Sequence, residues 1–255
     1  ACIAEERVPD GAELTYTYSV WKESVASPYA YLPQEVVSAG LSSPADLYVR
    51  GKEVYVLDSG NNRILVLDDS LSPVRSVSPQ KNVSLNGAAG IFVAEDGSIY
   101  IAIPEEESVV ILNSDGELKN RIGRPKSAIV PDSMVYKPKR VALGNDGNIN
   151  VVAEGCYFGM AVFNTRGEFL RFFGSNKVSA SVESFIASLK DIFLNEDQKR
   201  KTERILPAEY SSMDIDNEGF FYSVITKATG STSQVKKHSP SGENILPSND
   251  GFGDL

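Results

Sequence analysis

The feature that most constrains this chain is an internal repeat of about fifty residues. Four segments share one order: an alternating apolar run, a tight turn, a second apolar run, a variable loop, a third run and a polar turn. The turn glycines Gly97 and Gly147 are 50 residues apart, and a second set of turns agrees, because Gly116 and Gly167 are 51 residues apart. Glycine supplies the positive φ of a hairpin turn, so each segment is predicted to form about four short antiparallel strands.

A four-stranded unit of this length is typical of a β-propeller blade. The chain has 255 residues, 42% of them hydrophobic, which is enough to bury a large core. We therefore predict an all-β fold, with a disordered segment over residues 1–12 and a propeller domain over residues 13–255. The four blade units are expected at about residues 37–79, 80–127, 128–175 and 206–247.

A longer spacing before the last unit predicts an insertion. Gly147 and Gly219 are 72 residues apart, far more than the repeat requires. Apolar residues recur with a helical period in the extra stretch, at Val182, Phe185, Ile186, Leu189 and Phe193. We expect an insertion over residues 178–206 with helices at about 179–205, packed against the propeller.

The first unit carries the most specific motif in the chain. Its second apolar run, residues 54–57, is followed by Asp58 and then by the tripeptide Asn62-Arg63-Ile64. This resembles the NHL repeat, whose name tripeptide Asn-His-Leu is usually varied to Asn-Arg-Ile or Asn-Arg-Leu. The other three units keep the order of strands and turns without the tripeptide, so the resemblance covers about residues 37–247.

The resemblance extends to a subgroup of bacterial extracytoplasmic NHL proteins of unassigned function. It implies a location outside the cytoplasm, either secreted or as a membrane-anchored lipoprotein. It also implies a propeller that usually has six blades, so the four units could be part of a six-bladed ring. NHL propellers generally act as binding platforms, whereas some related six-bladed propellers are metal-dependent lactonases or lyases.

Asp58, Asn62 and Arg63 form the cluster closest to the family pattern. We predict a structural role, in which Asp58 and Asn62 bond loop amides and Arg63 bridges to a neighbouring blade. The alternative is a ligand site.

The first strand of each blade lines the central channel of a propeller. The residues just before these strands' apolar runs are Asp46, Gly90, Arg140 and Ser212. Mixed charge at a channel mouth can bind a polar ligand, so Asp46, Arg140 and Ser212 are the predicted ligand-binding residues. A structural ion pair and a site for ordered water are the alternatives.

The charge and the ends of the chain bear on partners. The net charge of −9 and the pI of about 4.8 predict repulsion from phosphate backbones, so we expect no nucleic-acid partner. No run of 18 apolar residues occurs, so we expect no transmembrane segment. Ala1-Cys2 resembles the end of a lipobox, which would place a lipid anchor at Cys2; a boundary within a disordered N-terminus is the alternative.

We find no catalytic constellation in the sequence. His238 is the only histidine, which argues against a zinc site or a Ser-His-Asp triad, and we interpret it as a surface residue before a turn. The loop Glu105-Glu106-Glu107 could attract Ca²⁺, but consecutive residues wrap an ion poorly, so a solvated acidic loop is favoured. Cys156 is expected to be a small packed residue.

These observations favour a non-catalytic scaffold that presents propeller loops to a protein or a glycan at the cell surface, with no required cofactor. The alternative is a Ca²⁺-dependent lactonase or lyase of the six-bladed type, with the metal at the channel mouth. That enzyme would need carboxylates from different blades to converge, and only Asp46 among the channel-mouth residues is acidic.

Overall fold

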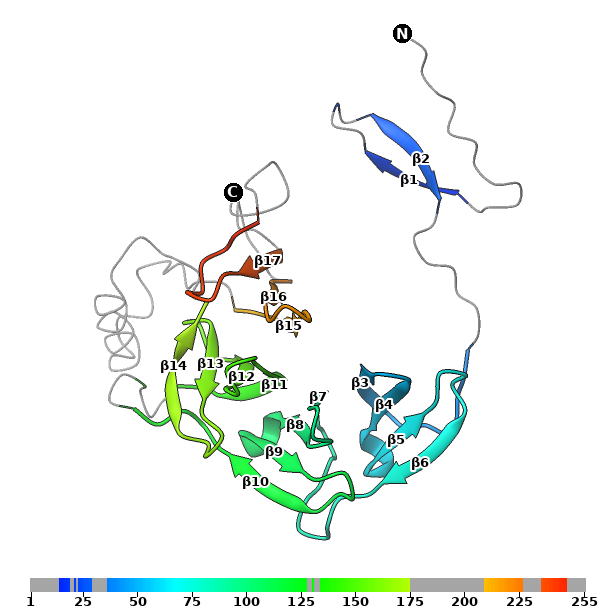
Figure 1. Ribbon diagram of the computed structural model, residues 1–255, viewed down its shortest axis with the longest axis vertical. Helices are drawn as coiled ribbons and strands as arrows, with labels where there is room; N and C mark the ends of the chain where they lie inside the picture. Colours follow the sequence, from blue (N-terminus) through cyan, green and yellow to red (C-terminus); the bar gives the residue numbers. More distant parts are fainter. Residues whose placement is uncertain are drawn as a thin grey trace, which may run out of the picture. The chain divides into compact units, whose positions relative to one another are not determined.

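The computed structural model describes residues 14–18, 21, 23–28, 36–127, 130, 134–174, 209–226 and 235–246 (Figure 1). The chain divides into two compact units, residues 1–38 and 39–255. In the first unit, strands β1 (Leu14–Tyr18) and β2 (Ser24–Pro28) form an antiparallel hairpin. The predicted disordered segment 1–12 and the predicted helices at 179–205 lie outside the described residues.

The second unit contains four antiparallel sheets in which the strands follow one another in chain order. Blade 1 consists of β3 (Pro44–Arg50), β4 (Glu53–Asp58), β5 (Arg63–Leu67) and β6 (Pro73–Val77). Blade 2 consists of β7 (Gly90–Val93), β8 (Ile99–Ile103), β9 (Ser108–Leu112) and β10 (Leu118–Ile122). Blade 3 consists of β11 (Lys137–Leu143), β12 (Ile149–Glu154), β13 (Met160–Phe163) and β14 (Phe169–Phe173). Blade 4 consists of β15 (Ser212–Ile215), β16 (Phe221–Val224) and β17 (Val235–His238). The prediction of an all-β propeller with four blade units is confirmed.

The repeated turns have the geometry that their sequence predicts. Gly97 and Gly147 both have φ of 77°, in the region that favours glycine. In blade 2 the amide of Gly97 donates to the carbonyl of Ala94 at 3.0 Å, and the Asp96 carboxylate accepts from the amide of Ser98 at 2.9 Å. The turns therefore fix the register of the first two strands of a blade.

The blades pack face to face through apolar layers. The inner strands contact one another in chain order, β3 with β7, β7 with β11, and β11 with β15. One buried cluster joins blades 1 and 2, and a second joins blades 2, 3 and 4. We call the face of each blade that packs on the preceding blade its back face, and the opposite face its front face.

Blade 4 continues beyond its third strand. After the turn that follows β17, Asn244 forms an antiparallel bridge with His238, and the amide of Ile245 donates to the carbonyl of Lys237 at 2.8 Å. Asn244 and Ile245 thus lie where a fourth strand of this blade would begin. Among the described residues, no helix is long and apolar enough to cross a membrane.

Candidate functional site

The motif loop of blade 1 is held together by a fully buried carboxylate. Asp58 accepts hydrogen bonds from the amide of Ser42 at 2.7 Å, from Nδ2 of Asn61 at 2.8 Å and from Nε of Arg63 at 2.7 Å. Burial disfavours the charged carboxylate, but the hydrogen bonds from Asn61, Ser42 and Arg63 outweigh it and lower the pKa of Asp58. The ion pair between Asp58 and Arg63 therefore holds the loop in place.

The two other motif residues anchor the loop on both sides. Arg63 also donates to the carbonyl of Gly40 at 3.1 Å, in the segment that leads into blade 1. Asn62 Oδ1 accepts from the amide of Leu85 at 2.7 Å, in the segment that leads to blade 2. It is thus Asn62, rather than Arg63 as expected, that reaches toward the next blade.

At the predicted channel mouth, Asp46 and Arg140 lie together around the start of β7. Asp46 Oδ2 accepts from the amide of Ile91 at 2.9 Å and lies 3.8 Å from the Arg140 guanidinium. Arg140 also donates to the carbonyls of Ala89 and Lys139. A Cβ at Gly90 would collide with the Lys139 carbonyl, which explains the glycine at this position of the repeat.

These contacts give Asp46 and Arg140 a structural role. Asp46 of blade 1 and Arg140 of blade 3 both bond the backbone of residues 89–91, at the start of blade 2. Ser212 lies on β15, where it pairs with Val224, and within the described residues it forms no hydrogen bond with Asp46 or Arg140. Ligand binding by Asp46, Arg140 and Ser212 remains a prediction.

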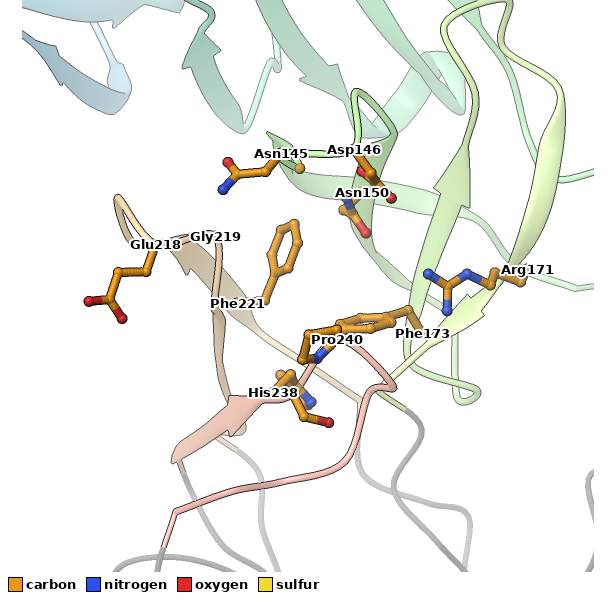
Figure 2. Close-up of a pocket in the computed structure, with 12 residues that line it drawn as sticks. Asn145, Asp146, Asn150, Arg171, Phe173, Glu218, Gly219, Phe221, His238 and Pro240 are labelled. Carbon is orange, nitrogen blue, oxygen red and sulfur yellow. The ribbon is translucent and has the colours of Figure 1, made fainter.

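A pocket of about 230 Å³ lies between blades 3 and 4 (Figure 2). Its walls come from the turns between β11 and β12 and between β15 and β16, from β12 and β14, and from the end of β17. Its base is aromatic, because the buried rings of Phe173 and Phe221 meet edge to face with centroids 5.8 Å apart.

Polar groups surround the two rings. The carboxamides of Asn145 and Asn150 lie on the blade 3 side, and Glu218 lies on the blade 4 side (Figure 2). The Arg171 guanidinium is 5.2 Å from the centroid of Phe173, and no described carboxylate is within ion-pair distance of it. Asp146 is engaged in its own turn, since its two oxygens accept from the amide of Asn148 at 3.0 Å and from Nδ2 of Asn148 at 2.6 Å.

His238 also lines this pocket, and the interpretation of it as a surface residue is wrong. It is the last residue of β17 and is only 2% exposed. The centroid of its ring is 5.7 Å from the ring centroid of Phe173 and 5.7 Å from that of Tyr210. Its Nε2 is 2.7 Å from Ser223 Oγ. Ser223 is fully buried, so a substrate cannot reach its hydroxyl and the pair is structural.

The sequence of β17 gave no signal that His238 is buried. Alternate residues of a strand share a face, and the residue two positions before His238 is Lys236, which is buried as well although lysine is usually exposed. The turn residues that form the pocket had no sequence signal either, because the turn around Asn145 and the turn around Glu218 come from different blades.

The acidic loop of blade 2 forms two ion pairs with basic side chains of blades 2 and 3. Glu105 Oε1 is 3.2 Å from Lys137 Nζ, and Glu106 pairs with Arg121. Within the described residues, no group of three or more His, Cys, Asp or Glu side chains is placed to hold a metal ion. Cys156 is a buried free thiol, and burial raises its pKa to about 12, so it is unreactive at neutral pH.

No family model matches the sequence, and no curated protein matches it. Among solved structures, the chain is similar to Kuenenia stuttgartiensis hydrazine synthase, with 14% identity, 85% of this chain and 51% of that chain covered, and a TM-score of 0.50. It is similar to a catalytically inactive virginiamycin B lyase from Staphylococcus aureus with quinupristin, with 13% identity, 91% and 61% covered, and a TM-score of 0.50. A Bacteroides fragilis protein described as exported matches with 12% identity, 91% and 54% covered, and a TM-score of 0.49.

The chain thus spans about half of the length of the hydrazine synthase chain and about three fifths of that of the lyase. At these identities the likeness shows the fold alone. The chain has the fold of a β-propeller.

Proposed function

We propose that this chain is a non-catalytic binding scaffold of the NHL kind that acts outside the cytoplasm. The family assignment rests on the motif Asp58 and Asn62-Arg63-Ile64, and it is supported by the bonds of its polar side chains to the backbone of the segments on either side of the blade, at Gly40, Ser42 and Leu85. The location rests on the resemblance to extracytoplasmic NHL proteins, with secretion or a lipid anchor at Cys2 as the two routes.

The observation that carries the binding proposal is the pocket between blades 3 and 4. Two apolar rings, Phe173 and Phe221, lie beside planar polar groups from Asn145, Asn150 and Arg171. Sugars bind where apolar ring faces are bordered by planar hydrogen-bonding side chains, because a sugar has both C–H faces and hydroxyl edges. The pocket is smaller than the roughly 300–1,000 Å³ of sites for drug-sized ligands, so we propose that it takes one residue of a glycan.

The contacts of Asp46 argue against the alternative function, a Ca²⁺-dependent lactonase or lyase with its metal at the channel mouth. A cation there would compete with the Arg140 guanidinium, 3.8 Å from the same carboxylate oxygen that bonds the amide of Ile91. Calorimetric titration with Ca²⁺ tests this directly. Micromolar binding that Asp46→Ala abolishes would favour the enzyme over the scaffold.

The test of the binding proposal is a glycan array followed by calorimetry on the best ligand. The variant Arg171→Ala removes the stacked guanidinium and should weaken binding about tenfold, which corresponds to about 1.4 kcal/mol. The matched control is Arg166→Ala, which removes the same charge from the exposed β13–β14 turn, outside the pocket lining, and should leave affinity unchanged. A blank array, or equal binding by both variants, would contradict the proposal.

A further inference from the structure

The pocket between blades 3 and 4 lies where one blade lacks a tyrosine that the other three blades carry. In the strand register, this position of the second strand is occupied by Tyr55, Tyr100 and Tyr222 in blades 1, 2 and 4. In blade 3 it is occupied by Asn150, which is 4% exposed and lines the pocket. A carboxamide thus lies where the repeat has a phenol ring.

The residue that pairs with Asn150 on the inner strand is small as well. In blades 1 and 2 the inner strand pairs this position with a second aromatic residue, Tyr48 and Phe92. In blade 3 the partner is Ala142. The rings of Phe92 and Tyr100 lie 6.1 Å apart between centroids in blade 2 and pack in the cluster that reaches blade 3. Blade 3 has no ring at either position, which leaves room for the ring of a ligand between blades 3 and 4.

Blade 1 shows what such a ring contributes to a neighbouring arginine. Arg75 in blade 1 and Arg171 in blade 3 occupy the same position of the fourth strand. The Arg75 guanidinium lies 5.5 Å from the centroid of the Tyr55 ring and donates to its hydroxyl at 3.0 Å. The same guanidinium is 3.8 Å from the Glu53 carboxylate. The side-chain partners of this arginine are therefore a ring, a hydroxyl and a carboxylate.

In blade 3 the corresponding partners of Arg171 are missing. Asn150 replaces the tyrosine, and Asn148, which is bonded within its own turn, takes the position of Glu53. The Arg171 guanidinium forms no hydrogen bond or ion pair with a described residue, and its ring contact is Phe173 at 5.2 Å. The hydroxylated ring and the carboxylate that blade 1 supplies itself are therefore left for a ligand to provide.

The two charged side chains Arg171 and Glu218 suit different groups of such a ligand. Figure 2 shows them on opposite sides of the aromatic base of the pocket. A guanidinium only donates, and its planar fork matches a carboxylate with two parallel bonds. A carboxylate only accepts, so Glu218 suits the hydroxyl groups of a sugar rather than a second anion. A singly charged carboxylate also fits beside Glu218 better than a phosphate, which carries up to two charges.

We infer that the pocket is selective for an acidic sugar, a hexuronate residue. Its ring takes the place of the tyrosine that blade 3 lacks, its carboxylate pairs with Arg171, and its hydroxyl groups donate to Glu218 and to Asn150 Oδ1. The inference rests on the proposed function, in which this pocket binds one residue of a glycan. Asn150 is then the specificity-determining residue, because its small size admits a ring that a tyrosine would exclude.

NMR titration with matched sugars tests the selectivity for charge. The probes are methyl glucuronide and methyl galacturonide, each compared with its neutral C6 carboxamide, which keeps the ring and every hydroxyl group. The acids should bind about tenfold more tightly than the amides, because a hydrogen bond between two charged groups is stronger. Arg171→Gln keeps a donor without the charge and should reduce the acids to the affinity of the amides. The control Arg166→Gln, in the exposed β13–β14 turn, should leave the preference unchanged.

A second variant tests the position of the ring. Asn150→Tyr restores the residue of the repeat, so the chain should keep its thermal stability and lose binding of acids and amides alike. Binding that survives in this variant would show that the sugar lies elsewhere, and it would overturn both the inference and the proposed pocket.

Other outcomes separate this inference from the proposed function. Equal affinities for acids and amides would overturn the inference, and so would a preference that Arg171→Gln retains. In both cases the pocket would still bind a sugar, provided that Asn150→Tyr abolishes the binding. If none of the four sugars shifts the resonances of the pocket residues, the inference fails, and the glycan array alone then decides the proposed function.

Discussion

The loops after the second strands of blades 1 and 2 have the same backbone and different side-chain chemistry. Each contains a 3-10 turn, Ser59–Asn61 in blade 1 and Pro104–Glu106 in blade 2. Each turn ends in a left-handed residue, Asn62 with φ of 51° and Glu107 with φ of 49°, whose amide donates back across the turn at 3.1 Å. The backbone of this loop is therefore a property of the blade, and the motif residues are not required to form it.

What the motif adds is a polar anchor beneath the loop. Asp58 is fully buried and bonded from three directions, whereas the equivalent residue of blade 2 is the buried, apolar Ile103. The carboxylates of blade 2 lie outside, where Glu105 and Glu106 pair with Lys137 and Arg121. The comparison indicates that this loop is anchored by a buried hydrogen-bond network in blade 1 and by apolar packing with surface ion pairs in blade 2.

Removal of the buried Asp58 carboxylate should cause the largest loss of stability. Asp58→Ala leaves the amide of Ser42, Asn61 and Arg63 without their acceptor, so we expect a loss of about 3 kcal/mol in the free energy of unfolding. Glu106→Ala removes only a partly exposed pair and should cost less than about 1 kcal/mol. Urea unfolding measures both, and equal losses would show that the two loops are anchored alike.

Acid should weaken the blade 1 anchor specifically. The pKa of Asp58 is lower in the folded protein than its ordinary value of 3.8, so its charged form stabilises the fold above about pH 4. That contribution is lost as the pH falls through the folded pKa. The difference in urea midpoint between the wild-type chain and Asp58→Asn should stay constant from about pH 7 to 5 and shrink below about pH 4. A difference that persists unchanged to pH 2 would mean that folding does not lower the pKa of Asp58.

The repeat made the blades predictable, and the reason is physical. Strand alternation and turn glycines are local features, and Gly97 and Gly147 have the positive φ that their spacing predicts. The structural role of Asp58 was also predictable, because short-range bonds within a loop depend on neighbouring residues. The partner of Arg63 was not, since Gly40 belongs to the segment that enters the blade.

The pocket could not have been found in this way. It requires Asn145 and Glu218 to meet across two blades, and neither turn differs from the other turns of the repeat. His238 was misjudged for the same reason, because its burial depends on Phe173 and Tyr210, which are distant in sequence. The predicted channel-mouth residues Asp46 and Arg140 do meet, but through backbone groups that the sequence pattern does not specify.

The arginine of the motif should tolerate lysine less well than the arginine of the neighbouring blade. Arg63 donates through Nε to Asp58 and through its terminal nitrogen to the Gly40 carbonyl, a fork that an ammonium group cannot reproduce. We expect Arg63→Lys to cost about 1 kcal/mol. Arg121→Lys keeps the charge beside the partly exposed Glu106 and should be nearly neutral. A neutral Arg63→Lys would reduce the anchor to a simple charge pair.

The smallest expected effect is that of glycine at the left-handed position of the two loops. The change in stability should have opposite signs in blade 1 and blade 2. At Glu107 a β-carbon is strained at φ of 49°, so Glu107→Gly relieves strain that exceeds the added chain entropy and should stabilise the fold by about 0.5 kcal/mol. Asn tolerates this conformation better, and Asn62 Oδ1 also bonds the amide of Leu85 at 2.7 Å. Asn62→Gly should therefore destabilise by about 1 kcal/mol. Thermal unfolding of the two variants measures both effects. If both variants stabilise the fold, backbone strain and not the bond to Leu85 decides the residue at this position; if Glu107→Gly destabilises it, the strain at Glu107 is smaller than the added chain entropy.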